Sequence, residues 1–279
     1  MLDREEYIEQ AYLFRVLGER MNSGMATQEL LALVKEEVLS TTKLPLAIDF
    51  LASELRHVGT FSSAMARLSH YFTPFQTFVA AEAENERGRF DLNVALKILE
   101  REALYRGENP LPQGIFLYQF ECLSRNRLGY DKGLEAVARD PVFDDAWREW
   151  ILIVRRQVGI VDFGDMVYVR SQQFIKDRLR KNPDARPLEK PALFGEKEGR
   201  IAWANRGKDP LLLFAALHRQ LGYPSVPKPV PIDETPLILP QVLRRVERME
   251  SRLKLLEEEQ KGGIDLSKFY NPGKLPPEV

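Results

Sequence analysis

The chain has 279 residues, and its 40 Lys and Arg residues nearly balance its 41 Asp and Glu residues, for a formal net charge of −1. Hydrophobic residues make up 44% of the chain and charged residues 29%, which excludes a wholly disordered chain and predicts a globular fold with a sizeable core. A net charge this close to zero gives no global attraction to nucleic acid or to an anionic membrane surface.

The number of cysteines and the distribution of apolar residues indicate the cellular compartment in which the chain folds. A single cysteine, Cys122, cannot form an internal disulfide, so the fold does not need an oxidising compartment. Residues 1–6 show no basic segment followed by an apolar run, and no apolar stretch approaches the ~18 residues of a membrane-spanning helix. We therefore expect a cytoplasmic protein with no membrane contact.

Helix-start and helix-stop residues recur along residues 1–222. A helix starts favourably at Asp or Thr followed by proline, or by an acidic residue three positions later, and it ends favourably at glycine. The predicted starts and stops are Asp3 with Glu6, Thr73-Pro74 to Gly88, Asp91 to Gly107, Asp140-Pro141 to Gly159, and Asp209-Pro210 to Gly222.

Apolar residues between these positions follow the helical period of 3.6 residues. Three such stripes are Ile48, Leu51, Leu55 and Val58; Leu92, Ala95, Leu96, Leu99 and Ala103; and Trp147, Trp150, Ile151, Val154 and Val158. Each stripe must pack on a neighbour, and the connections are short, so successive helices should lie antiparallel. We predict an all-α fold, an antiparallel helical array or bundle, with a solenoid-like arrangement as one form of it.

Residues 95–141 contain a further pattern of large, small and turn residues. It consists of Leu117, Phe120, Gly129-Tyr130, Gly133 and Asp140-Pro141, with Ala95 and Leu99 in the preceding hairpin. In these positions the segment resembles a pair of tetratricopeptide hairpins, which implies stacked antiparallel helices. It departs from that family at Glu121 and Ser124, and Ala95 and Gly133 lie 38 residues apart instead of about 34.

Two segments leave a choice between helix and strand. The segment 160–169 is rich in β-branched residues, but Asp162 and Asp165 stand at the cap and third positions of a helix, so we favour a helix there. Its shared face would comprise Phe163, Met166, Val167, Arg170 and Phe174. The segment 200–204 is a weaker strand candidate.

A proline-rich segment follows Gly222. It contains Pro224, Pro227, Pro229, Pro231, Pro236 and Pro240. This density blocks a helix and favours an extended path. The segment is either a free linker, at about 3.1 Å per residue, or a strap that lies along the helical body.

The C-terminal apolar pattern is that of a coiled coil. Leu239, Val242, Val246, Met249, Leu253 and Leu256 alternate at spacings of three and four residues, as the a and d positions of heptads do. Arg245 and Arg252 fall at g positions, and Glu250 and Glu257 at the e positions five residues later. In a parallel pair of helices each of these arginines faces a glutamate of the partner, so the pattern predicts self-association as a dimer or a larger oligomer.

The alternative is an amphipathic helix that packs on its own body, because three heptads are marginal as an isolated coiled coil and single charge pairs add little. We divide the chain into a helical body (1–221), a proline-rich linker (222–238), a coiled-coil helix (239–261) and a flexible tail (262–279). A boundary inside the body, near residue 88 or residue 159, stays open.

Motifs for metal and phosphate chemistry are incomplete. Glu54 and His57 form half of a di-iron carboxylate pattern, but neither His70 nor His218 has a glutamate three residues before it. The glycines near residues 195–208 do not form a phosphate loop, and the Asp-Phe-Gly triplet at 162–164 lacks the other kinase motifs. Cys122 lies in an apolar helix, where we interpret it as a buried structural residue. We predict no catalytic, cofactor-binding or metal-binding residues.

Two other functions stay open as alternatives. An enzyme with a dispersed acidic site would use Glu82, Glu84, Glu86, Glu100, Glu102 and His70. A nucleic-acid-associated regulator would use the clusters Arg125-Asn126-Arg127, Arg155-Arg156 and Arg178-Leu179-Arg180-Lys181, although cations are also favoured at helix C-termini. We favour a non-catalytic scaffold or adaptor that self-associates through the C-terminal coiled coil and binds protein partners.

Overall fold

The computed structural model describes residues 2–21, 25–85, 88, 90–183, 189–228, 245, 246, 248–250 and 253. The chain divides into two compact units, Met1–Pro229 and Val230–Val279. Within the described residues the regular elements are helices, and the only β-type pairings are isolated bridges. This confirms the all-α prediction. No helix of the described part is long and apolar enough to cross a membrane.

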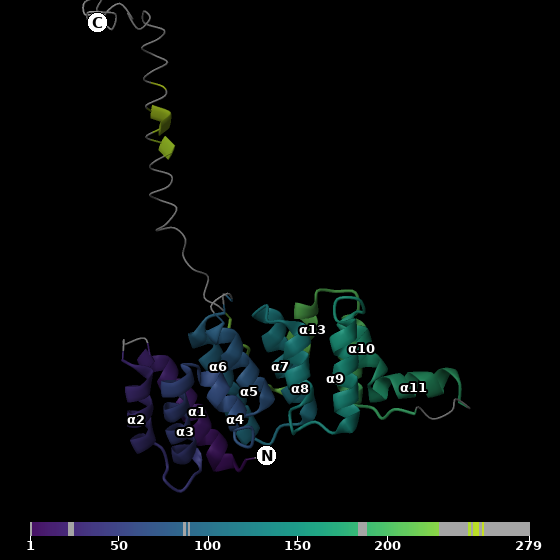
Figure 1. Cartoon of the computed structure of the whole chain (residues 1–279). Helices are drawn as coiled ribbons and strands as arrows, with labels where there is room; N and C mark the ends of the chain where they lie inside the picture. The colour runs from purple at the N-terminus through teal and green to yellow at the C-terminus, as the bar shows by residue number, and fades with distance from the viewer. Residues whose placement is uncertain are drawn as a thin grey trace, which may run out of the picture. The chain divides into compact units, whose positions relative to one another are not determined.

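The named helices all lie in the first unit (Figure 1). They are α1 (Arg4–Met21), α2 (Thr27–Glu37), α3 (Leu44–Val58), α4 (Phe61–Arg67), α5 (Pro74–Glu84), α6 (Leu92–Gly107), α7 (Pro112–Arg125), α8 (Tyr130–Ala138), α9 (Asp145–Gln157), α10 (Phe163–Val169), α11 (Gln172–Lys181), α12 (Glu196–Ala204) and α13 (Pro210–Leu221).

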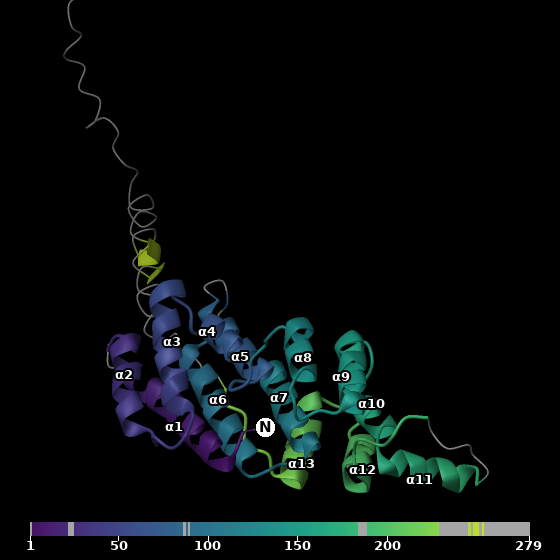
Figure 2. The same cartoon turned by 60° about the horizontal axis from the view of Figure 1, so that its bottom comes forward.

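Most helices of this unit pack on the next helix of the chain, as the short connections predict. Figures 1 and 2 both show α2 and α3 at one end of the unit and α10 and α11 at the other, and Figure 2 shows α12 beside α11. The most extensive contact is not sequential, because it joins α1 to α6. Gly18 lies against Leu96 and Gly107 lies against Tyr7, so these two helices run antiparallel at close range.

Most of the predicted helix starts are confirmed by their caps. The backbone N–H of Val94 donates to Asp91 at 3.0 Å, that of Asp165 to Asp162 at 3.2 Å, and that of Leu211 to Asp209 at 2.8 Å. Gly222 ends α13 in the left-handed conformation, with φ of 68°. These aspartates mark the starts of α6, α10 and α13, since they satisfy backbone groups that the helix itself leaves unpaired.

The start of α5 carries a complete capping box. The backbone N–H of Gln76 donates to Thr73 Oγ1 at 3.2 Å, and that of Thr73 donates to Gln76 Oε1 at 3.0 Å. Gln76 is buried and also donates to the side chain of Gln10 in α1 at 2.8 Å. The cap therefore ties α5 to α1 as well. The helix ends at Glu84, before the predicted stop at Gly88.

The predicted helix start at Asp140-Pro141 is wrong. α9 begins at Asp145, and its cap is Asp144, which accepts a hydrogen bond from the backbone N–H of Trp147 at 2.9 Å. Asp140 is fully buried, and its carboxylate is engaged by the guanidinium of Arg106. An Asp-Pro pair is common in turns as well as at helix starts. Here the ion pair with the buried Arg106 holds Asp140 in a turn.

Two other local predictions need correction. The strand candidate at 200–204 is the second half of α12. Phe174 does not share a helix with Phe163, because α10 ends at Val169 and Phe174 lies in α11. Ser171 caps the new helix by accepting a hydrogen bond from the backbone N–H of Phe174 at 3.3 Å. The cap at Ser171 therefore starts a new helix, although the apolar spacing from Phe163 to Phe174 continues through this position in the sequence.

The first residues of the proline-rich segment, 222–228, lie along the body as a strap. Tyr223 is buried, and its hydroxyl donates to Glu121 of α7 at 2.7 Å. The side-chain amide of Asn126 donates to the carbonyl of Pro227 at 3.2 Å. Arg101 of α6 donates to the hydroxyl of Ser225 at 2.8 Å. Residues 229–244 lie outside the described part of the chain, so the path of the remaining prolines stays a prediction.

The capping box of α5 makes a measurable contribution to stability. Thr73→Ala removes the acceptor for the Gln76 N–H, and we expect it to lower the free energy of unfolding by about 1 kcal/mol in urea titrations. Thr60→Ala is the matched control, because Thr60 is the N-cap of α4 but makes no side-chain cap hydrogen bond. Equal losses in the two variants would contradict the role of the capping box.

Candidate binding site between α9 and α10

A tight turn joins α9 to α10 and places one face of each helix opposite the other. The backbone N–H groups of Ile160 and Val161 both donate to the carbonyl of Gln157, at 2.9 and 3.0 Å. Gly159 has φ of 83°, a left-handed conformation that glycine adopts without strain. Asp162 then caps α10, so the chain reverses within a few residues.

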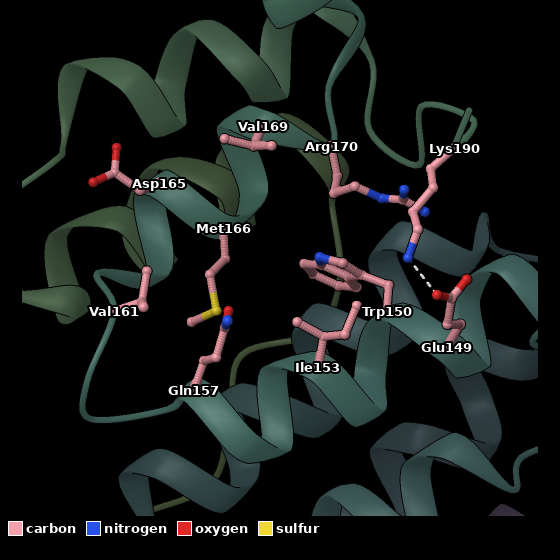
Figure 3. Close-up of a pocket in the computed structure, with 10 residues that line it drawn as sticks. All are labelled: Glu149, Trp150, Ile153, Gln157, Val161, Asp165, Met166, Val169, Arg170 and Lys190. Atoms are coloured by element: carbon pink, nitrogen blue, oxygen red, sulfur yellow. Dashed lines mark hydrogen bonds and ion pairs between the residues drawn. The ribbon is translucent and has the colours of Figure 1, made fainter. Parts of the chain in front are cut away.

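A pocket of about 250 Å³ lies between these helices (Figure 3). Residues three or four positions apart share a face of a helix, and both helices contribute such sets. The lining residues are Glu149, Trp150, Ile153 and Gln157 of α9, Asp165, Met166 and Val169 of α10, and Val161, Arg170 and Lys190 of the connections.

The apolar wall of the pocket rests on a packed aromatic cluster. Trp150 is buried, with its ring centroid 4.9 Å from that of Phe116 and 5.2 Å from that of Phe194. Edge-to-face contacts at these distances stabilise the ring orientation. The wall is therefore preformed by the core of the protein. At its rim Val161 and Val169 are exposed, so apolar surface continues out of the pocket.

One edge of the pocket carries an excess of positive charge. Lys190 forms an ion pair with Glu149, and this contact holds the pKa of that carboxyl below its usual range. Arg170 lies on the same edge, and burial lowers the pKa of its guanidinium although Glu149 raises it. Within the described residues Arg170 Nε is buried without a hydrogen-bond partner. Two cations thus face one carboxylate there.

The opposite edge is electrically balanced. Asp165 forms an ion pair with Arg206 at 3.2 Å. The guanidinium of Arg206 also lies over the ring of Trp203, with 3.2 Å between its central carbon and the ring centroid. Arg206 is therefore held in place by a charge and by an aromatic face. Among the described residues that line the pocket, the buried side-chain atom without a hydrogen-bond partner is Arg170 Nε.

This pocket is not evident from the sequence. Trp150 and Met166 stand in apolar stripes that the periodicity predicts as core, and Arg170 stands in the second stripe as a member of a helix face. Lys190 lies twenty residues further along the chain and carries no motif. The sequence signal that could have indicated this site is the pair of predicted helices on either side of Gly159. Each has an acidic residue next to an apolar one, Glu149 with Trp150 and Asp165 with Met166. This signal indicates facing helices, but not a space between them.

A second polar cluster is closed inside the body. The guanidinium of Arg106 binds Glu102 at 2.8 Å and also binds Asp140, and all three side chains are buried. Gln119 of α7 donates to both carboxylates, at 2.9 and 3.0 Å. Burial by itself lowers the pKa of Arg106, but the two carboxylates hold it above its ordinary value. The cluster joins α6, α7 and the loop before α9.

Two of the acidic residues proposed as an enzyme site have structural roles. Glu102 belongs to the buried Arg106 cluster. Glu84 accepts hydrogen bonds from the backbone N–H groups of Phe61 and Ser62 at the start of α4. His70 is exposed, and Glu86 lies outside the described residues. Among the described side chains no group of three or more His, Cys, Asp or Glu residues is placed to hold a metal ion.

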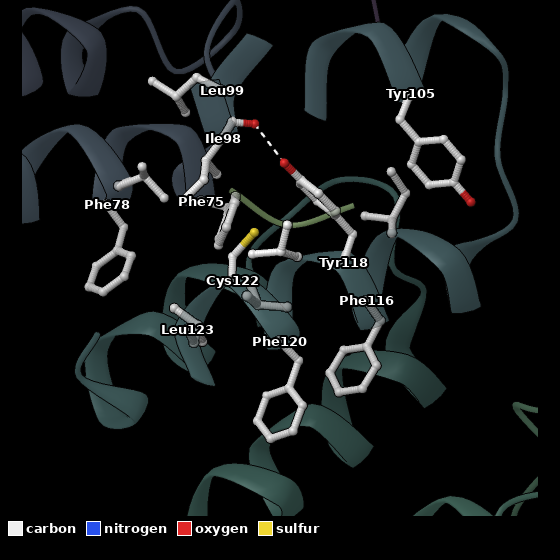
Figure 4. Packing of buried hydrophobic residues seen from close by; sticks show 14 of the residues in the cluster. Phe75, Phe78, Ile98, Leu99, Tyr105, Phe116, Tyr118, Phe120, Cys122 and Leu123 are labelled. Atoms are coloured by element: carbon white, nitrogen blue, oxygen red, sulfur yellow. Dashed lines mark hydrogen bonds between the residues drawn. The ribbon is translucent and has the colours of Figure 1, made fainter. Parts of the chain in front are cut away.

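Cys122 is a core residue, as its apolar surroundings in the sequence predict (Figure 4). Burial raises the pKa of its thiol well above the ordinary value, which keeps the reactive thiolate from forming. The neighbouring Tyr118 is also buried, and its hydroxyl donates to the carbonyl of Ile98 at 2.9 Å. This hydrogen bond joins α7 to α6 within the core.

The remaining motif residues lie at different places along the body, and Asn126 of the first arginine cluster is buried. Glu54 forms an ion pair with Arg67, while His57 is exposed in the last turn of α3. Of the arginine clusters, Arg125 pairs with Glu121, and Arg155 pairs with Asp131 at 2.7 Å. The third cluster lies in the last turn of α11, where cations are favoured by the helix dipole.

The predicted oligomerisation residues are described in part. Arg245, Val246, Met249, Glu250 and Leu253 have helical backbone and are exposed. Leu239, Val242, Arg252, Leu256 and Glu257 lie outside the described residues. The helix prediction therefore agrees with the structure at the described positions, and the coiled coil remains a prediction.

Comparisons of the chain with protein-family models, with curated proteins and with solved structures find no match. The tetratricopeptide resemblance therefore depends only on the positions named above. One of them has a clear structural counterpart. Gly133 of α8 packs so closely on Leu123 of α7 that an added methyl group would meet its side chain at 2.7 Å. What the protein does has to be inferred from its own residues.

The buried arginine cluster gives a stability prediction. Arg106→Met leaves two buried carboxylates without their cation, and we expect a loss of about 3–5 kcal/mol in the free energy of unfolding. Arg139→Met is the control, because Arg139 pairs with Glu135 at the surface, where such pairs contribute little. Denaturant titrations of both variants test this difference. Similar effects would show that Arg106 does not hold the cluster together.

Proposed function

We propose that this protein is a non-catalytic cytoplasmic adaptor, which self-associates through residues 239–261 and binds protein partners with its helical body. The observation that carries this proposal is the exposed apolar seam. Val246, Met249 and Leu253 stand at successive a and d positions, and 45%, 62% and 56% of their surfaces are exposed in the single chain. Apolar side chains repeated along one helix face gain stability when a partner helix covers them.

A second copy of this chain is the partner that the charges favour. In a parallel pair Arg245 faces Glu250 of the other copy, and Arg252 faces Glu257. An antiparallel pair would instead bring g positions together, arginine against arginine. Such pairs contribute only a few tenths of a kcal/mol each, so they select the orientation of the helices more than they determine the affinity.

The body supplies the surface for other proteins. Its helices pack largely in chain order, and in solenoid-like proteins this arrangement presents an extended binding surface. The pocket between α9 and α10 adds an apolar recess on that surface. Joining two bodies through one coiled coil would raise the affinity for a partner with two binding segments, because the second contact becomes intramolecular.

The first test of self-association is the solution mass by light scattering. We expect the full chain to have at least twice its mass of 32.1 kDa, and a chain that ends at Thr235 to be monomeric. The truncated chain keeps the helical body and lacks residues 236–279, which contain the predicted seam. If both proteins are monomers, the seam does not join copies of the chain, and the adaptor proposal loses its main support.

Charge reversal tests the parallel register. Arg245→Glu with Arg252→Glu places glutamate against glutamate, and we expect the doubly substituted chain to be monomeric or to dissociate at higher protein concentration. Adding Glu250→Arg and Glu257→Arg restores attraction, and with it the mass of the natural chain. Arg244→Glu with Arg248→Glu is the matched control, because both positions lie away from the seam. Loss of self-association in the control would contradict this register.

A further inference from the structure

We propose that the pocket between α9 and α10 binds one large apolar side chain of a protein partner together with a carboxylate next to it. This inference rests on the proposed adaptor function, because it names the chemistry of the segment that the body would recognise. It assigns the apolar side chain to the wall of Trp150 and Met166, and the carboxylate to Arg170.

The size of the pocket favours a single side chain. Pockets that enclose small-molecule ligands usually measure about 300–1,000 Å³, whereas this one measures about 250 Å³. Figure 3 shows Trp150, Ile153 and Met166 around the space between the two helices. Because Trp150 is fixed by Phe116 and Phe194, the recess needs little rearrangement to receive its occupant.

The charged residues at one edge of the pocket indicate the carboxylate of the ligand. Lys190 is already paired with Glu149, so the cation left at this edge is Arg170. Its Nε is buried without a hydrogen-bond partner among the described residues. A guanidinium binds a carboxylate through two parallel hydrogen bonds. A carboxylate from the partner would therefore bind the terminal nitrogens of this guanidinium, which burial does not close off and no ion pair occupies among the described residues, and would balance the excess charge.

The position of the charges also gives the ligand an orientation. Asp165, on the other edge, is occupied by Arg206, so a partner's acidic group gains nothing there. A basic group near Arg170 would be repelled by two cations and attracted by only one carboxylate. The pocket thus discriminates between acidic and basic segments that carry the same apolar residue.

The probe for this proposal is the capped tetrapeptide acetyl-Gly-Phe-Glu-Gly-amide, added to the full chain with methyl-labelled methionine. Met166 is one of six methionines, and its NMR signal is assigned with Met166→Leu. We expect this peptide to shift the Met166 signal saturably. The matched peptides with Phe-Gln, Phe-Lys and Ala-Glu should bind at least about tenfold more weakly, because each lacks one of the two elements.

A pair of variants identifies the cation. In Arg170→Gln the affinity for the Phe-Glu peptide should fall about tenfold, to the affinity of the Phe-Gln peptide, which should itself stay unchanged. Arg200→Gln is the matched control, because Arg200 is exposed and pairs with Glu196 in α12 away from the pocket. The peptide comparison in the natural chain does not depend on how well either variant folds.

Three outcomes would overturn the proposal. They are the absence of any shift of Met166 at millimolar peptide, equal affinities for the Phe-Glu and Phe-Gln peptides, and binding of 3-phenylpropionate as tight as that of the peptide. The last result would make the pocket a site for a small carboxylic acid. Because these readings are made on the full chain whatever its mass, failure of the pocket and failure of self-association are separate results.

Discussion

The guanidinium of Arg106, buried between two carboxylates, is the interaction on which much of the helical body depends. It holds Glu102 within α6 and Asp140 in the loop after α8, while Gln119 brings α7 to the same point. A buried charge is tolerated only with such partners. Because Asp140 is fixed in this loop, the following helix begins at Asp145. This start sets which residues of α9 line the pocket between α9 and α10.

The strap shows the same principle at the edge of the core. Glu121 of α7 is buried, and it is satisfied by Arg125 and by the hydroxyl of Tyr223. Burial raises the pKa of Tyr223 well above its ordinary value, and Glu121 raises it further, so its hydroxyl stays a donor. Residues 222–228 thereby complete the body. A buried polar group such as Glu121 needs a hydrogen-bond partner, and here Tyr223, about a hundred residues further along the chain, supplies one.

The pocket and the exposed apolar positions of the predicted seam lie in different units of the chain. The first unit has a rigid recess with one cation that lacks a hydrogen-bond partner at Nε among the described residues. The second has helical positions whose apolar side chains are exposed. These are the two features on which the proposed adaptor function rests.

The sequence by itself determined the all-α class and the starts of several helices, because caps such as Asp91 and Thr73 and the apolar period act within a few residues. It also placed Cys122 in the core. Only the tertiary structure decided the pairing of α1 with α6, the role of Asp140 and the assembly of the pocket around Arg170. Those depend on which groups meet across long stretches of chain, and neither periodicity nor spacing carries that information.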